Sequence, residues 1–367
     1  MGLLDFLLPF RAFSYKIGDI DLKFRTGVSE EYNDNISQNS VNAKSDAITN
    51  LKFGLNAFYE GKTQNLNFSG DIIRHIFSQN PKLSNTTEEF GLRYNKEFSR
   101  RGRLSLTEAF LHSEEPTSFE DEFGRTSGRY SYTRNRFNSS YTHDLSKQIT
   151  LSLNYGNETI EYSRVNPADT FTNNAGFEAA YAISSADILY AIYGFTVKKY
   201  AHGSAFKTNR LSGGWRHYFT SQLYLDALAG QDFIKSSHLN RAKTENYIST
   251  SLTDEFDQTT KGVLSFLKEG GANSDTQDIR ESWRVSLDLT KQLFARLNAG
   301  LSGFFGEGKF SSSGTNDKLK GANIGLAYEI SKSWKSNLSY SLSNLTSNVS
   351  TREYTVNRIS LGATYEF

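Results

Sequence analysis

The chain has 367 residues, a net charge of +1 and a mean hydropathy of −0.54. The balanced charge gives no basis for binding nucleic acid. The absence of cysteine excludes disulfides, thiol catalysis and cysteine-ligated zinc. No stretch approaches the roughly 20 apolar residues of a membrane helix.

The first ten residues are apolar, but they lack the basic region and small-residue cleavage site of a signal peptide and include Asp5. We therefore expect a mature or trimmed chain. Residues 1–18 would form a periplasmic or interfacial segment, and residues 19–367 a single domain. The alternative for the start is a short amphipathic segment that packs on the domain or lies at the membrane surface.

Apolar and polar residues alternate with a period of two along most of the remaining chain, which is typical of strands with one apolar face. The clearest examples are residues 51–59, 149–155, 293–305 and 359–367. The pattern predicts about 18 strands of roughly 9–15 residues. The pair near 246–256 and 259–268 is the weakest, and without it about 16 strands remain.

Short polar turns and long polar segments separate these strands in alternation. The short turns are residues 98–104, 145–149, 183–188, 219–223, 289–293 and 330–334. The long segments are residues 33–46, 78–86, 113–127, 157–172, 235–245, 269–278, 306–318 and 344–353. This order predicts an all-β fold, a transmembrane up-and-down antiparallel β-barrel with short periplasmic turns and long extracellular loops.

Strands of a soluble β-sandwich also alternate apolar and polar residues, but their connections include Greek-key crossings. The strands predicted here instead follow one another as hairpins. Aromatic residues at the strand ends favour girdles at a lipid interface: Tyr59, Tyr94, Phe98, Tyr155, Phe219, Tyr328, Trp334 and Tyr365. The final Tyr365 and Phe367 resemble the C-terminal insertion signal of outer-membrane barrels. We therefore expect a bacterial, Gram-negative outer-membrane location and contact with the barrel-insertion machinery.

The opposite face of the strands is predicted to line an aqueous lumen. Its charged candidates are Arg25, Arg93, Arg134, Arg136, Arg210, Arg216, Arg284, Arg296, Arg358, Asp71, Glu89, Asp226 and Asp288. The excess of arginine favours a conduit that prefers anions. The alternative is that these charges pair with one another within the lumen.

The third long segment is acidic, with Glu114, Glu115, Glu120, Asp121 and Glu122. It resembles, in position and charge, the third loop of trimeric diffusion porins, which folds inward against wall arginines. It is therefore a candidate constriction loop. The alternative is a solvated surface loop.

No catalytic or metal-binding pattern stands out. The six histidines lack metal-ligand spacing, and there is no Gly-x-Ser-x-Gly motif. We predict that the chain is not an enzyme and that it has no metal and no cofactor.

Residues 27–36 read GVSEEYNDNI and residues 44–49 read KSDAIT. Both stretches resemble the opening of an outer-membrane β-barrel family found with exopolysaccharide export systems. The resemblance implies a monomeric barrel through which a polysaccharide leaves the cell. A proline frequent in the family's second strand is missing at residues 52–54.

Our prediction is therefore a passive conduit for an exopolysaccharide. The alternatives are a diffusion porin for small solutes, with a preference for anions, and a structural barrel that sheaths or anchors a partner. The expected partners are outer-membrane lipid and lipopolysaccharide, with a periplasmic export apparatus or a lipoprotein in addition.

Overall fold

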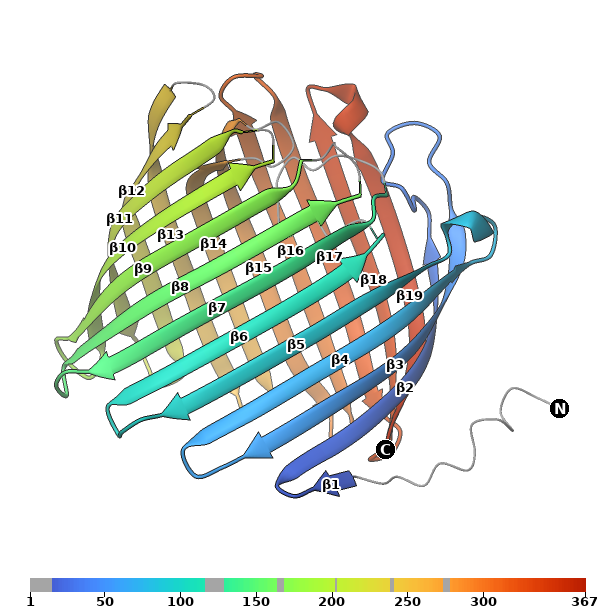
Figure 1. Cartoon of the computed structure of the whole chain (residues 1–367), viewed down its shortest axis with the longest axis horizontal. Coiled ribbons are helices and arrows are strands. Elements are labelled where there is room, and N and C mark those ends of the chain that lie inside the picture. The colour runs from blue at the N-terminus through green and yellow to red at the C-terminus, as the bar shows by residue number, and fades with distance from the viewer. Residues whose placement is uncertain (1–14, 116–128, 164–167, 202, 238–240, 273–277) are drawn as a thin grey trace.

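The computed structural model describes residues 15–115, 129–163, 168–201, 203–237, 241–272 and 278–367. These residues form one β-barrel with two short 3₁₀ helices, η2 (Pro81–Leu83) and η3 (Ser350–Arg352), in the connections (Figure 1). In this described part, no helix is long and apolar enough to cross a membrane.

The strands follow one another in chain order. They are β1 (Tyr15–Ile17), β2 (Ile20–Asn33), β3 (Asp46–Glu60), β4 (Gln64–Phe77), β5 (Asn85–Glu97), β6 (Gly102–Ser113), β7 (Tyr132–Asp144), β8 (Ile149–Tyr162), β9 (Thr170–Ala182), β10 (Asp187–Tyr200), β11 (Ala205–Tyr218), β12 (Leu223–Ser236), β13 (Arg241–Asp257), β14 (Thr260–Ala272), β15 (Ile279–Phe294), β16 (Leu297–Phe310), β17 (Asn316–Glu329), β18 (Trp334–Ser347) and β19 (Tyr354–Glu366).

Each strand from β2 to β19 pairs antiparallel with the next, and β19 pairs with β2, so these 18 strands close on themselves. At the seam, the backbone N–H groups of Phe24 and Phe367 each donate to the other residue's carbonyl at 2.8 Å. The predicted up-and-down barrel of 18 strands is confirmed. The 16-strand alternative is wrong, because β13 and β14 are both present. The short β1 adds to the lower end of β2.

Five of the six predicted short turns share one hydrogen-bond pattern. The prediction of a turn at residues 289–293 is wrong, because these residues belong to β15 and the chain turns at residues 295–296. The Ser146 hydroxyl accepts from the backbone N–H groups of Gln148 and Ile149 at 3.1 and 3.0 Å. Ser and Thr side chains favour such turns because their oxygen replaces a backbone acceptor. The same arrangement recurs at Ser99, Ser184, Thr220 and Ser331.

The two faces of the wall differ in polarity. Large apolar side chains such as Leu153 and Leu211 are exposed on one face, as expected for contact with lipid. On the other face, Arg25 of β2 meets Asp71 of β4 at 2.8 Å, across the intervening β3. A Cβ at Gly54 of β3 would lie 2.2 Å from Asp71, so glycine makes this contact possible. Side chains two strands apart meet on a concave surface, so this face is the inner one.

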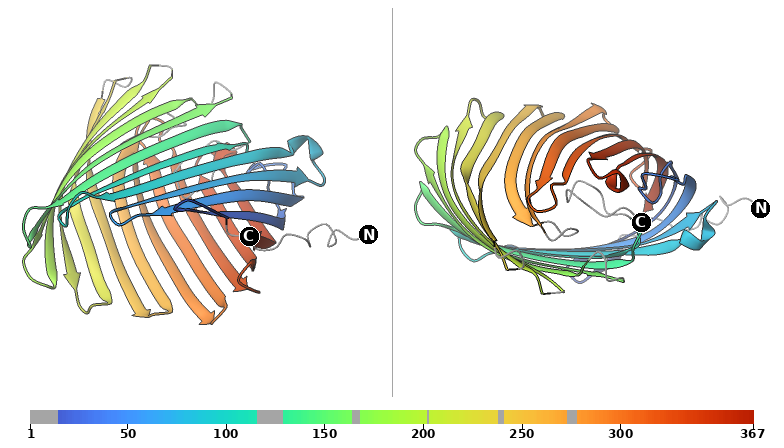
Figure 2. Two further views of the ribbon diagram at one scale, coloured as in Figure 1. Left: turned by 60° about the horizontal axis from the view of Figure 1, so that its bottom comes forward. Right: turned by 90° about the horizontal axis from the view of Figure 1, so that it is seen from above.

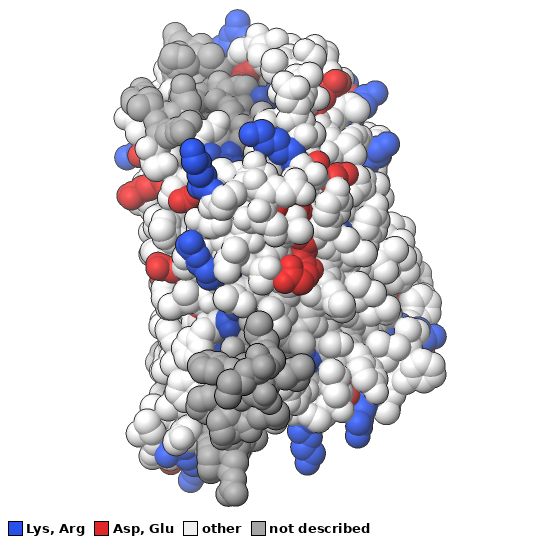
Figure 3. Space-filling view, turned by 90° about the vertical axis from the view of Figure 1, so that its right-hand side faces the viewer, with Lys and Arg blue, Asp and Glu red and all other residues white. Residues whose placement is uncertain are grey.

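Seen from above, the barrel is oval, with a flatter side along β5–β8 (Figure 2). On the face shown in Figure 3, Lys, Arg, Asp and Glu side chains lie over the upper and central parts, and further Lys and Arg side chains lie along the lower edge. Three small apolar clusters lie near the long-loop ends of the strands, around Phe77, Phe206 and Leu345.

Candidate functional site

The lumen wall carries arginines that are paired with carboxylates. Arg134 and Arg136 of β7 both donate to Glu158 of β8, at 2.9 and 2.8 Å through their Nε atoms. Arg216 and Asp226 form a bidentate pair at 2.6 and 3.0 Å. Because these guanidinium groups face carboxylates, part of the positive field suggested by the arginine count is neutralised locally.

The register places the predicted lumen residues Arg25, Arg93, Arg134, Arg136, Arg210, Arg216, Arg284, Arg358, Asp71, Glu89, Asp226 and Asp288 on the inner face. The prediction for Arg296 is wrong. This residue lies in the turn between β15 and β16, where its Nη1 donates to the Ile330 carbonyl at 3.4 Å. The strand alternation does not extend into a tight turn. Whether the wall residues act on a solute stays a prediction.

The described base of the third loop contacts its own other end and residues at the neighbouring long-loop ends, rather than the predicted wall arginines. Glu115 pairs with Arg129, at the other end of the loop. Arg129 also stacks over the Phe77 ring at 4.7 Å and donates to the Ile36 carbonyl at 3.2 Å. Glu114 makes no side-chain hydrogen bond or ion pair with the described residues, while Glu120, Asp121 and Glu122 lie outside them.

The described segment that enters the lumen belongs to another hairpin, at the upper ends of β14 and β15. The ladder between β13 and β14 stops at Ile248 and Lys268, although both strands continue upward. Above this point, β14 remains paired with β15 as far as Ala272 and Ile279. We call residues 269–272 and 279–282 the inner tip, because they leave the wall and pack on its inner face.

A buried carboxylate holds the inner tip. Asp232 of β12 has no exposed surface and accepts from the Gly270 backbone N–H at 3.1 Å. Arg210 of β11 donates to Asp232 at 2.7 Å and to Glu269 at 3.1 Å, and it stacks over the Tyr247 ring at 3.8 Å. One guanidinium thus links the wall to the tip. Removing one member of such a buried pair typically destabilises strongly, because it leaves the other charge uncompensated.

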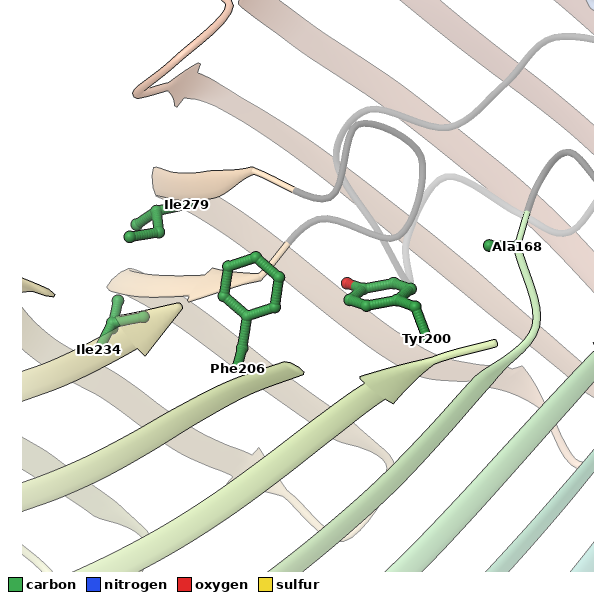
Figure 4. Packing of buried hydrophobic residues seen from close by; sticks show 5 residues of the cluster. All are labelled: Ala168, Tyr200, Phe206, Ile234 and Ile279. Atoms are coloured by element: carbon green, nitrogen blue, oxygen red, sulfur yellow. The ribbon is translucent and has the colours of Figure 1, made fainter. Parts of the chain in front are cut away.

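Apolar packing supports the same attachment. Ile279, at the start of β15, lies against Phe206 and Ile234 of the wall, with Tyr200 and Ala168 extending the cluster (Figure 4). Gly270 permits the close approach, because a Cβ there would lie 2.7 Å from Ile234 and 2.8 Å from Glu245. The tip is therefore fixed by a charge network on one side and by buried side chains on the other.

One outer-face group contains the residue types of a hydrolase. His217 Nδ1 lies 2.8 Å from Asp187, but the Ser184 hydroxyl also donates to Asp187 rather than contacting the imidazole. A serine nucleophile needs its base within hydrogen-bond reach, and this group does not provide that contact. No cluster of potential metal ligands occurs within the described ranges.

Comparison with known proteins agrees with this architecture. Residues 281–367, from β15 to the end of β19, match a family described as "Putative beta-barrel porin 2". The match covers the last five strands, and the described residues form a closed antiparallel barrel of 18 strands. No functionally curated protein matches this chain.

Solved structures with the same fold include OccK2 (OpdF) of Pseudomonas aeruginosa, in complex with glucuronate. It has a TM-score of 0.51 at 9% identity, covering 95% of this chain and 98% of the other. OccAB4 of Acinetobacter baumannii has a TM-score of 0.51 at 10% identity, covering 94% and 98%. A mutant of the ferric enterobactin receptor PfeA of P. aeruginosa has a TM-score of 0.51 at 8% identity, covering 94% and 80%.

Proposed function

We propose that this porin-like barrel is a passive diffusion channel for small solutes. The observation that carries the proposal is the inner tip, which Asp232 and Arg210 hold inside a lumen whose wall is polar. Because a fixed hairpin occupies part of the lumen, passage of a small solute is favoured over passage of a polysaccharide. This supports the small-solute alternative over our first prediction of exopolysaccharide export.

The wall chemistry suggests weak rather than strong ion selectivity. Arginine–carboxylate pairs such as Arg216–Asp226 present little net charge to a passing ion. A strongly anion-selective pore would need unpaired cations along the path. Glucuronate in the OccK2 structure shows that a small sugar acid binds a barrel of this fold, and a solute of similar size fits our proposal.

Swelling of liposomes that contain the purified chain tests this function. We expect glucose to enter readily and the swelling rate to fall steeply along a series of longer glucose oligomers. Empty liposomes and liposomes carrying heat-denatured protein are the controls. Passage of a long polysaccharide at a rate comparable to glucose would instead support export and contradict the proposal.

A further inference from the structure

A hollow of about 400 Å³ lies between the inner tip and the wall strands β8–β11. Wall residues Asn154, Asn174, Thr196 and Thr208 line one side, and residues 269–272 of the tip line the other. The inner tip thus narrows the lumen and also forms one side of this hollow.

The floor of this hollow is bare backbone. Gly176 of β9 and Gly194 of β10 are paired directly across the two strands. A Cβ at either position would meet nothing closer than 3.6 Å, in contrast to the sterically required Gly54 and Gly270. Neither floor glycine has a positive φ. Packing therefore does not explain them, and glycine within a strand often marks the close approach of a ligand.

Most groups around the floor are neutral hydrogen-bonding groups. The charged ones are Arg210, Glu269 and Lys198, whose ammonium group lies 5.8 Å from the centre of the Tyr200 ring. Asn154 and Asn174 are exposed, and among the described residues no hydrogen bond occupies their carboxamides. Arg210 is already engaged by Asp232 and Glu269. A carboxamide offers both donors and an acceptor, which suits a solute whose hydroxyl groups both donate and accept.

The same arrangement occurs a second time in the opposite wall. A hollow of about 560 Å³ toward the short-turn end is lined by Asn298 and Asn337. Its floor contains Gly300 and Gly325, again paired directly, and a Cβ at either would meet nothing within 4 Å. Both asparagines are exposed and have no hydrogen-bond partner in the part of the chain that the structure describes.

We infer that these two hollows are successive binding stations for neutral, polyhydroxylated solutes, of the size of a mono- or disaccharide. The paired glycines let a sugar ring approach the backbone, and the flanking carboxamides bond its hydroxyls. Because one hollow adjoins the inner tip and the other lies nearer the short turns, a solute meets them in sequence. This inference rests on the proposed diffusion function and gives it a substrate class.

The test is block of single-channel ion current by added sugar in planar bilayers, with glucose, maltose, glucuronate and a poly(ethylene glycol) of similar size as probes. We expect saturable block by maltose, and weaker block by glucuronate and by the glycol, which lacks neighbouring hydroxyls. The double change Asn154→Ala with Asn174→Ala should weaken maltose block about tenfold, the loss expected for one or two neutral hydrogen bonds.

Replacing the paired glycines of each hollow with valine gives a second, independent test. Gly176→Val with Gly194→Val, and Gly300→Val with Gly325→Val, should each reduce maltose block while an ion current remains. Ser105→Val, on the inner wall of β6 outside both hollows, is the control for added bulk and should leave block unchanged. Block equal to wild type in both filled variants, or stronger block by glucuronate than by maltose, would overturn the inference. Loss of ion current in the wild-type chain would instead contradict the diffusion function itself.

Discussion

The Gly270 backbone N–H lies 3.1 Å from Asp232 Oδ2, although β14 and β12 are not neighbours in the wall. This bond forms because β14 leaves β13 above Lys268 and crosses onto the inner face. The attachment makes the inner tip a removable constriction, and side chains added at its contact surface should displace it.

Gly270→Val should raise single-channel conductance, because a Cβ there would collide with Ile234 and Glu245 and push the tip from the wall. Gly271→Val is the matched control, since its Cβ would meet only Arg280 at 3.9 Å. We expect the Gly271 variant to conduct as the wild type does, or slightly less. Equal conductance in both variants would show that the tip does not limit the current.

Ion selectivity should depend on unpaired rather than paired arginines. Arg93 is exposed on the inner face and has no ion-pair partner among the residues described. Arg93→Gln should therefore shift the reversal potential in a salt gradient toward cation preference. The double change Arg216→Gln with Asp226→Asn removes a bonded pair without changing net charge and should shift it much less. A larger shift in the double variant would contradict this account.

Glu108 is an outward-facing carboxylate within the apolar belt. It lies opposite Leu92 on β5 and Phe137 on β7. A charged side chain on the lipid face of a barrel is destabilising. We expect Glu108→Leu to raise the free energy of unfolding by about 1–2 kcal/mol, measured by urea titration in lipid vesicles.

The matched reverse change is Leu92→Glu, which should lower the same free energy by a similar amount. If Glu108→Leu destabilises the barrel, the carboxylate must have a partner at this surface, and its assignment as lipid-facing would be incorrect.

The C-terminal residue closes the barrel. Phe367 exchanges two backbone hydrogen bonds with Phe24, and their rings lie 5.9 Å apart. Deleting Phe367 should cost about 2–3 kcal/mol in unfolding free energy, from the lost hydrogen bonds and ring contact. Phe367→Ala keeps the backbone bonds and should cost less. Measuring insertion rates with and without the insertion machinery would separate the loss of barrel stability from the loss of recognition of the terminal residue.

The barrel could be predicted from the sequence because alternation and turn composition are local signals. A turn such as 145–149 carries its own hydrogen-bond acceptor in Ser146. Even the weak strands near 246–256 and 259–268 are present as β13 and β14, with longer bounds.

The inner tip could not be predicted, because residues 269–278 have ordinary loop composition and their attachment depends on long-range contacts. The pairing of Arg210 with Glu269 joins residues far apart in the chain. The sequence also suggested the third loop as the constriction, since its acidic residues are adjacent in the chain. The adjacent glycines 270 and 271 could have indicated a close approach to the wall. This interpretation requires knowing that Ile234 and Asp232 face them.

Single-channel conductance of the purified chain alone, in planar bilayers, tests the central claim most directly. The account predicts a steady ohmic current without any added partner, with a step size that increases in Gly270→Val. A wild-type chain that stays closed until an export partner is supplied, or never conducts, would contradict a passive diffusion channel narrowed by the inner tip.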